Sequence, residues 1–88
     1  MTEKGMDVDQ VLKMAKQLNS AAEDITTMQS DLTTGLEEVD WTGPDADDFR
    51  GSWESEMVPA LKSIRTAVEQ LGATAESNAS EQTTVSSH

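Results

Sequence analysis

The chain has 88 residues, 17 acids against six bases, a formal net charge of -11, 35% hydrophobic residues and no cysteine. A chain of this length forms at most one small domain and buries only about 60% of the surface that it exposes when unfolded. The charge disfavours nucleic acid and anionic membrane surfaces as partners, and the lack of cysteine excludes a disulfide scaffold and thiol catalysis. We therefore expect a core shared with another protein chain.

Both ends of the sequence are polar. Residues 1–10 lack the basic and apolar regions of a Sec-type signal peptide, and no apolar run is long enough to insert into a membrane. From Gly72 onward the sequence is rich in Ala, Thr, Ser, Asn, Glu and Gln, so we expect residues 81–88 to form a disordered tail. The folded domain is predicted to span residues 1–80.

The first predicted helix covers about residues 7–39. Asp7, followed three residues later by Gln10, fits a capping box at its start. Hydrophobic residues then recur about every 3.5 residues, the heptad period of a coiled-coil seam. The predicted seam contains Val11, Ala15, Leu18, Ala22, Ile25, Gln29, Leu32, Leu36 and Val39.

Residues 40–44 (Asp-Trp-Thr-Gly-Pro) predict a turn, because Pro44 suits the first turn of a new helix. A second helix is predicted over about residues 45–75. Pro59 lies inside it and removes the hydrogen bond to the carbonyl of Ser55, so we expect a bend near residues 55–59 or a complete break. The apolar stripe of this helix recurs about every 3.6 residues and contains Ala46, Phe49, Trp53, Met57, Ala60, Ile64, Val68 and Leu71.

The short connection predicts that the two helices fold back on each other as an all-α antiparallel hairpin. The two apolar stripes extend around more of each helix than a single neighbour covers, so we expect two hairpins to pair into a four-helix bundle. Met14, Met28 and Met57 are expected to fill the core or the dimer interface. The residues assigned to the core or interface are Val11, Leu18, Ile25, Leu32, Leu36, Phe49, Trp53, Met57, Leu61, Ile64, Val68 and Leu71.

No residue pattern indicates an enzyme, a metal site or a bound cofactor. The single histidine is His88, the last residue, and no serine or threonine has a base in a recognisable motif. Acidic residues gather around the turn, but starting a calcium loop at Asp45 places Phe49 at its fifth position and Arg50 where glycine belongs. We interpret this cluster as a solvated hairpin tip; it consists of Glu37, Glu38, Asp40, Asp45, Asp47 and Asp48.

Trp41 and Gly43 form a Trp-x-Gly turn between two amphipathic helices, and residues 41–50 continue it as Trp-Thr-Gly-Pro-Asp-Ala-Asp-Asp-Phe-Arg. With Trp53 and Pro59-Ala60-Leu61 following, the chain resembles, over nearly its whole length, the WXG family of early-secreted-antigen-like proteins. The resemblance implies hairpins that pair antiparallel as homodimers or heterodimers. It also implies export of the folded pair by the type VII secretion machinery, with Trp41 and Gly43 in a composite export signal.

One feature departs from the family pattern. Many actinobacterial members carry a Tyr-x-x-x-Asp/Glu signal after the second helix, whereas this chain has no tyrosine. Either a partner supplies that signal, or residues 76–82 serve in another form, or the protein is not itself an autonomous substrate. From the residues alone, Trp41 is equally well explained as a ring that seals the end of the hairpin.

The leading functional hypothesis is a non-enzymatic protein that is secreted without a Sec signal, is cytoplasmic before export, and acts by protein–protein binding. The alternative is an intracellular adaptor or chaperone that completes the helical bundle of a larger secreted effector. A third hypothesis, an acidic mimic of nucleic acid, rests on charge alone. It is the weakest of the three, because the charge is divided almost evenly between the two halves of the chain.

Overall fold

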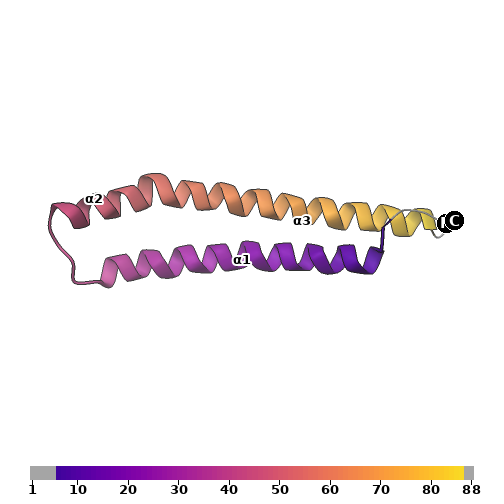
Figure 1. The fold of residues 1–88 in the computed structure, drawn as a ribbon, viewed down its shortest axis with the longest axis horizontal. Helices are drawn as coiled ribbons and strands as arrows, with labels where there is room; N and C mark the ends of the chain where they lie inside the picture. Colours follow the sequence, from indigo (N-terminus) through magenta and orange to yellow (C-terminus); the bar gives the residue numbers. More distant parts are fainter. Residues whose placement is uncertain (1–5, 87–88) are drawn as a thin grey trace.

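The computed structural model describes residues 6–86, and each of its elements is a helix. Helix α1 (Val8–Glu38) is followed by a short turn, α2 (Pro44–Ser52), the π-helix η1 (Trp53–Met57) and α3 (Val58–Ser86). The last three form one continuous helical arm that runs antiparallel to α1 (Figure 1). The predicted all-α helical hairpin is confirmed.

The start and end of α1 lie within one residue of the predicted bounds. The side chain of Asp7 caps the helix, its Oδ1 accepting a hydrogen bond from the backbone N–H of Gln10 at 3.1 Å. At the other end Val39 turns to an extended backbone, and its N–H donates to the carbonyl of Gly35 at 2.9 Å. A local sequence signal therefore determines the start of this helix.

The hairpin is a thin rod of 66 × 17 × 15 Å. Its radius of gyration is 19.6 Å, whereas a compact domain of the same length has one of about 12 Å. Its accessible surface is 6329 Å², against about 5000 Å² for a typical folded monomer of this mass. Two helices side by side share only one seam, so much of the apolar surface stays exposed.

Small side chains fill the seam. Ala15, Ala22 and Ala79 are buried in it, and Trp53, 9% exposed, is its one large buried side chain within the described residues 6–83. At Gly72 a Cβ atom would lie 2.7 Å from Asn19 Oδ1, so α1 and α3 pass close to each other here. The seam is narrow, and it buries little hydrophobic surface in a single hairpin.

One side of the seam is polar. Three side chains of α1 at heptad spacing hydrogen-bond across to the other arm: Asn19 donates to Glu76 (3.1 Å), Thr26 accepts from Arg65 (3.4 Å) and Thr33 accepts from the indole N–H of Trp53 (2.9 Å). Bonds of this kind set the register of two helices, because a shifted pairing leaves them unmade.

The predicted seam of α1 differs from the observed one near its C-terminal end. Leu32 and Val39 are exposed, and Thr33 lies against the other arm in place of Leu32. The cause is the helical period, because a row of residues seven apart drifts about 20° per heptad on a straight helix. Leu18 and Ile25 are still half-buried, but the same row has rotated out of the seam by Leu32.

Pro59 neither breaks the arm nor interrupts its helical path. The π-helix η1 ends at Met57, two residues before Pro59, with the N–H of Val58 donating to the carbonyl of Trp53, five residues back. The bonding pattern therefore changes just ahead of the proline, which has no N–H to donate. The complete break that the sequence allowed does not occur, and the π-helix overlaps residues 55–59, where a bend was expected.

The π-turn also changes which residues of the second arm face α1. Ala46, Trp53 and Val68 lie in the seam as predicted, but after η1 most contacts move on by one residue, to a line that includes Val58, Leu61 and the small residues Gly72 and Ala75. The expected stripe continued through Met57, Ile64 and Leu71, which are exposed, as is Phe49 before the π-turn. An extra residue in one turn produces this rotation.

Helix α3 also extends further than predicted. We expected helix to about residue 75 and disorder over 81–88, whereas α3 continues to Ser86; residues 87–88 lie outside the described part of the chain. Ala75 and Ala79 are buried against the first turns of α1, which lies beside this part of α3 (Figure 1). Packing on α1 therefore maintains helix in a stretch whose composition resembles a tail.

Candidate functional site at the hairpin tip and along one face

The turn at the hairpin tip depends on one glycine. Gly43 has φ 114° and ψ 176° and precedes Pro44, the first residue of α2. Its carbonyl accepts the N–H of Asp47 at 3.0 Å, the first bond of that helix. L-residues with a Cβ atom avoid this φ region, so the glycine of the Trp-x-Gly motif is required by the backbone.

A substitution of Gly43 by alanine is expected to lower the free energy of unfolding by about 1–2 kcal/mol, because it forces a Cβ atom into the left-handed region. Gly35→Ala is the matched control: this glycine lies within α1 with open space around it, and alanine there is expected to stabilise by up to about 1 kcal/mol. Urea denaturation followed by circular dichroism measures both. Equal effects of the two substitutions would contradict the assigned turn.

Arg50 connects the two arms at the tip. Its guanidinium donates to the carbonyls of Leu36 (3.0 Å), Trp41 (2.9 Å) and Val39 (3.4 Å). The end of α1 has no basic residue of its own in its last turn, so Arg50 supplies the positive charge that the negative end of the helix dipole favours. Our sequence reasoning missed this role, although Arg50 is the only base between residues 16 and 62.

The tryptophan of the motif lies partly on the surface. The Trp41 ring packs against Phe49, with centroids 5.5 Å apart and planes tilted by 58°, a favourable aromatic geometry. Trp41 is nevertheless 39% exposed. The ring covers the end of the hairpin through Phe49 and still offers apolar surface for contact with another molecule.

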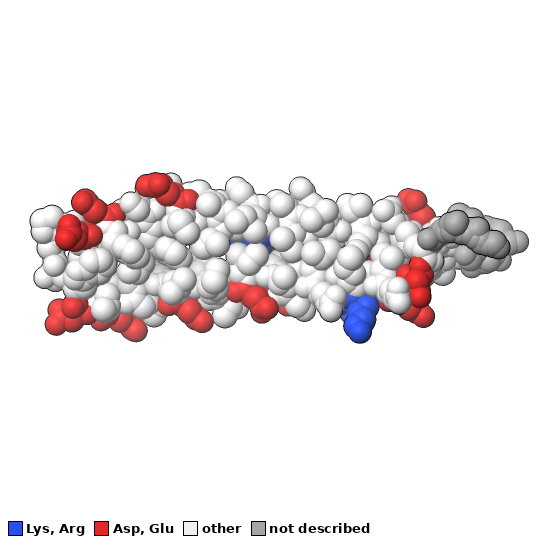
Figure 2. Space-filling model, viewed as in Figure 1, with Lys and Arg blue, Asp and Glu red and all other residues white. Residues whose placement is uncertain are grey.

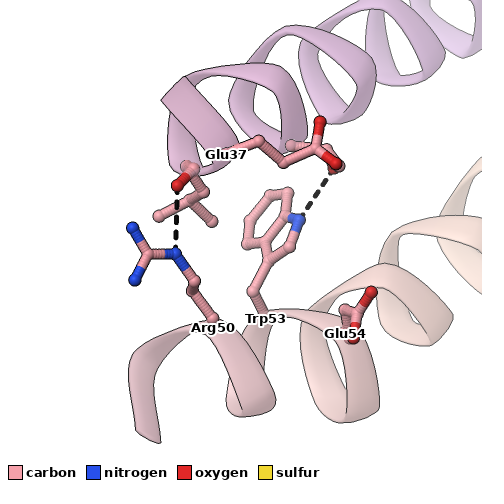
Figure 3. Close-up of a pocket in the computed structure, with 6 residues that line it drawn as sticks. Glu37, Arg50, Trp53 and Glu54 are labelled. Atoms are coloured by element: carbon pink, nitrogen blue, oxygen red, sulfur yellow. Dashed lines mark hydrogen bonds between the residues drawn. The ribbon is translucent and has the colours of Figure 1, made fainter. Parts of the chain in front are cut away.

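A small pocket near the hairpin tip is lined by residues of α1, α2 and η1 and has a volume of about 150 Å³ (Figure 3). The indole of Trp53 forms one wall, with its N–H bound to Thr33. Glu37 extends from α1 toward this indole, while Arg50 turns away to the carbonyl of Leu36. The pocket therefore combines an apolar wall with carboxylates at its edge; its lining residues are Thr33, Leu36, Glu37, Arg50, Trp53 and Glu54.

Large hydrophobic side chains collect on one side of the hairpin, which we call the apolar face. Successive residues are about 100° apart around a helix. On α1 and on the second arm, the large hydrophobic side chains occupy the side that comes just before the residues facing the other arm. In an antiparallel pair such positions lie on the same side. With exposed fractions between 43 and 59%, the members of the apolar face are Met14, Met28, Leu32, Val39, Phe49, Met57, Ile64 and Leu71.

The apolar face carries little charge along its middle. Figure 2 shows a broad uncharged band along the two arms, with most of the acidic side chains at the ends and edges of the view. The polar row of Asn19, Thr26 and Thr33 lies on the other side of the seam. The hairpin thus has one face suited to burial and another that is already hydrogen-bonded.

The predicted core or interface residues divide into two groups. Trp53 is buried, and the half-buried ones are Val11, Leu18, Ile25, Leu36, Leu61 and Val68. The other five belong to the apolar face, together with Met14 and Met28; they are Leu32, Phe49, Met57, Ile64 and Leu71. The pattern that we interpreted as one core is therefore distributed over the seam and an exposed surface.

Within residues 6–86, no three acidic or histidine side chains are grouped so that they could hold a metal ion. The acids of the tip point to solvent as separate exposed groups. None of the described helices is long and apolar enough to span a membrane. Comparison with models of protein families, with curated proteins and with solved structures found no match.

Proposed function

We propose that this protein is a non-enzymatic helical hairpin that pairs through its apolar face with a second hairpin, either another copy or a related chain. The pair is exported, folded, by type VII secretion and acts by binding other proteins. The observation that carries the proposal is the apolar face itself: a band of large hydrophobic side chains along a hairpin whose own seam is filled mostly by alanine and glycine.

The exposed area supports pairing. The chain exposes 6329 Å², about 1300 Å² more than a typical monomer of its mass, and a stable interface buries about 800 Å² per partner. Each large side chain that becomes fully buried contributes roughly 1.5–3 kcal/mol. Packing a second hairpin on the apolar face therefore supplies the hydrophobic stabilisation that one hairpin lacks.

The resemblance of Trp41-x-Gly43 to the WXG family supports export. The exposed ring of Trp41 packs on Phe49, which belongs to the apolar face. A partner seated on that face would come close to the motif, so pairing would place an exposed tryptophan beside residues of the second chain. A composite export signal made by two chains requires this kind of proximity.

Immunoblots of culture fractions test export. In the source organism we expect the protein in the medium, and deletion of the type VII secretion ATPase is expected to retain it in the cells. A Sec-dependent secreted protein, measured in the same fractions, controls for lysis and for general secretion defects. Equal extracellular levels with and without the ATPase would rule out export by this route.

A substitution of Trp41 by alanine separates the two roles of the motif. It removes an aromatic pair worth about 0.5–1.5 kcal/mol beyond area burial, so we expect a modest loss of stability in urea denaturation and a much larger loss of exported protein. Phe49→Leu, which removes the same ring pair but keeps Trp41, is the matched control. Equal loss of export in both variants would indicate that only the stability of the tip matters.

The absence of tyrosine supports a second candidate function. An adaptor that remains inside the cell needs no signal of the Tyr-x-x-x-Asp/Glu type and would use the apolar face to complete the helical bundle of an effector. Affinity purification from the cytoplasm distinguishes the two. Recovery of a larger helical protein that depends on Ile64 would favour the adaptor, whereas a stable complex of two hairpins would favour the exported pair.

A further inference from the structure

The pocket beside Trp53 has the size and the chemistry of a site for one side chain. Its volume is about 150 Å³, similar to that of a cavity that holds a benzene molecule. The wall formed by Trp53 and Leu36 is apolar, and the indole N–H is already bound to Thr33. The indole N–H is therefore not available to a ligand, and tryptophan is the aromatic residue whose ring best attracts a cation.

The charges at the rim point to a cation as well. Glu37 and Glu54 contribute to the lining from opposite arms, and both are exposed. Arg50 also lines the pocket, but its guanidinium donates to three backbone carbonyls at the end of α1, where the negative end of the helix dipole offsets its charge. Two carboxylates from facing arms therefore set the electrostatics of the opening.

We propose that this pocket takes an arginine or lysine side chain from a partner protein. The aliphatic stem packs on Leu36 and Trp53, while the charged group lies over the indole and pairs with Glu37 and Glu54. The chain has 17 acids and six bases, and this negative charge favours a basic partner surface in general. In the pocket, one basic side chain of the partner is removed from water in addition to being attracted by this charge.

The proposal does not depend on pairing through the apolar face. By helical rotation of about 100° per residue, Glu37 and Glu54 lie on the opposite side of the seam from Leu32 and Phe49. A hairpin seated on the apolar face therefore leaves the pocket open, and the two surfaces can hold different molecules at the same time.

Titration of the full ¹⁵N-labelled chain with N-acetyl-L-arginine amide tests the proposal. The two indole N–H signals are followed, each assigned by its own Trp→Phe variant. We expect a saturable shift of the Trp53 signal with a smaller effect on Trp41. The neutral analogue N-acetyl-L-citrulline amide is expected to give no saturable shift, because it keeps the shape of the side chain and lacks the charge.

A charge-matched pair of variants locates the site. Glu37→Gln with Glu54→Gln is expected to weaken binding of the arginine amide about fivefold or more. Glu38→Gln with Glu56→Gln removes the same charge from neighbouring exposed positions outside the pocket, and is expected to leave binding nearly unchanged. Molar mass, measured for each variant, reports separately on pairing.

Three results would overturn the proposal. Equal weakening by both pairs of variants would assign the effect to net charge alone. An equal response to citrulline amide, or to N-acetyl-L-leucine amide, would show that the pocket does not select a cation. Equal shifts of both indoles would place binding outside the pocket.

Discussion

Replacing Ile64 with aspartate is expected to disperse the assembled protein into single hairpins. Ile64 lies in the middle of the apolar face and is 51% exposed in one hairpin, so the substitution adds a charge that only pairing would bury. Burial of an unpaired carboxylate costs several kcal/mol, which corresponds to a dissociation constant at least about 100-fold higher. Light scattering is expected to give twice the chain mass for the wild type and a single-chain mass for the variant.

Ser63→Asp is the matched control for this experiment. Ser63 is exposed on the same helix and lies about 100° around the helix axis from Ile64, on the side away from the apolar face. The substitution therefore adds the same charge without placing it in the proposed interface. We expect its molar mass to equal that of the wild type. An unchanged mass for Ile64→Asp would contradict pairing through the apolar face, whether the second hairpin is another copy or a co-purified relative.

Replacing Trp53 with alanine is expected to lower the free energy of unfolding by about 3–5 kcal/mol. Trp53 is the one large side chain buried in the seam among residues 6–83, and its removal leaves a cavity opposite Thr33. Such a loss is a large fraction of the total stability of a small domain. Urea denaturation at a fixed chain concentration measures it, because pairing also contributes to apparent stability.

Two further substitutions separate the contributions of Trp53. Trp53→Phe keeps an aromatic ring and loses the 2.9 Å hydrogen bond to Thr33, which is expected to cost about 1 kcal/mol together with some packing. Leu71→Ala removes a side chain that is 59% exposed in the hairpin and is expected to cost much less than Trp53→Ala in a variant that does not pair. A similar loss for Leu71→Ala and Trp53→Ala would contradict the assignment of Trp53 as the main anchor.

The sequence predicted the starts of both helical arms well, because these depend on neighbouring residues. Asp7 with Gln10 marks the start of α1, and Gly43-Pro44 marks the start of α2; both act within a few residues. The role of Gly43 was also readable, since a glycine before a helical proline is typical of a turn that needs an unusual backbone. The role of Arg50 at the tip could not be predicted in this way, because it depends on which carbonyls lie within its reach across the hairpin.

The sequence could not determine which side of each helix faces the other. On α1, two overlapping rows of apolar residues at similar spacing are compatible with a seam, and the choice between Leu32 and Thr33 depends on the drift of a straight helix and on the hydrogen bond between Thr33 and Trp53. On the second arm, the stripe through Met57, Ile64 and Leu71 is the more hydrophobic one, yet it lies outside the seam.

The sequence by itself determined that the chain forms two long amphipathic helices joined by a Trp-x-Gly turn, because caps, turn residues and periodicity act locally. Only the tertiary structure decided how the apolar residues are divided between the seam and the apolar face. The π-turn before Pro59 rotates the rest of the arm by one residue, and close approach of the helices at Gly72 admits small residues in place of large ones. The large ones remain on the surface, where a second chain can cover them.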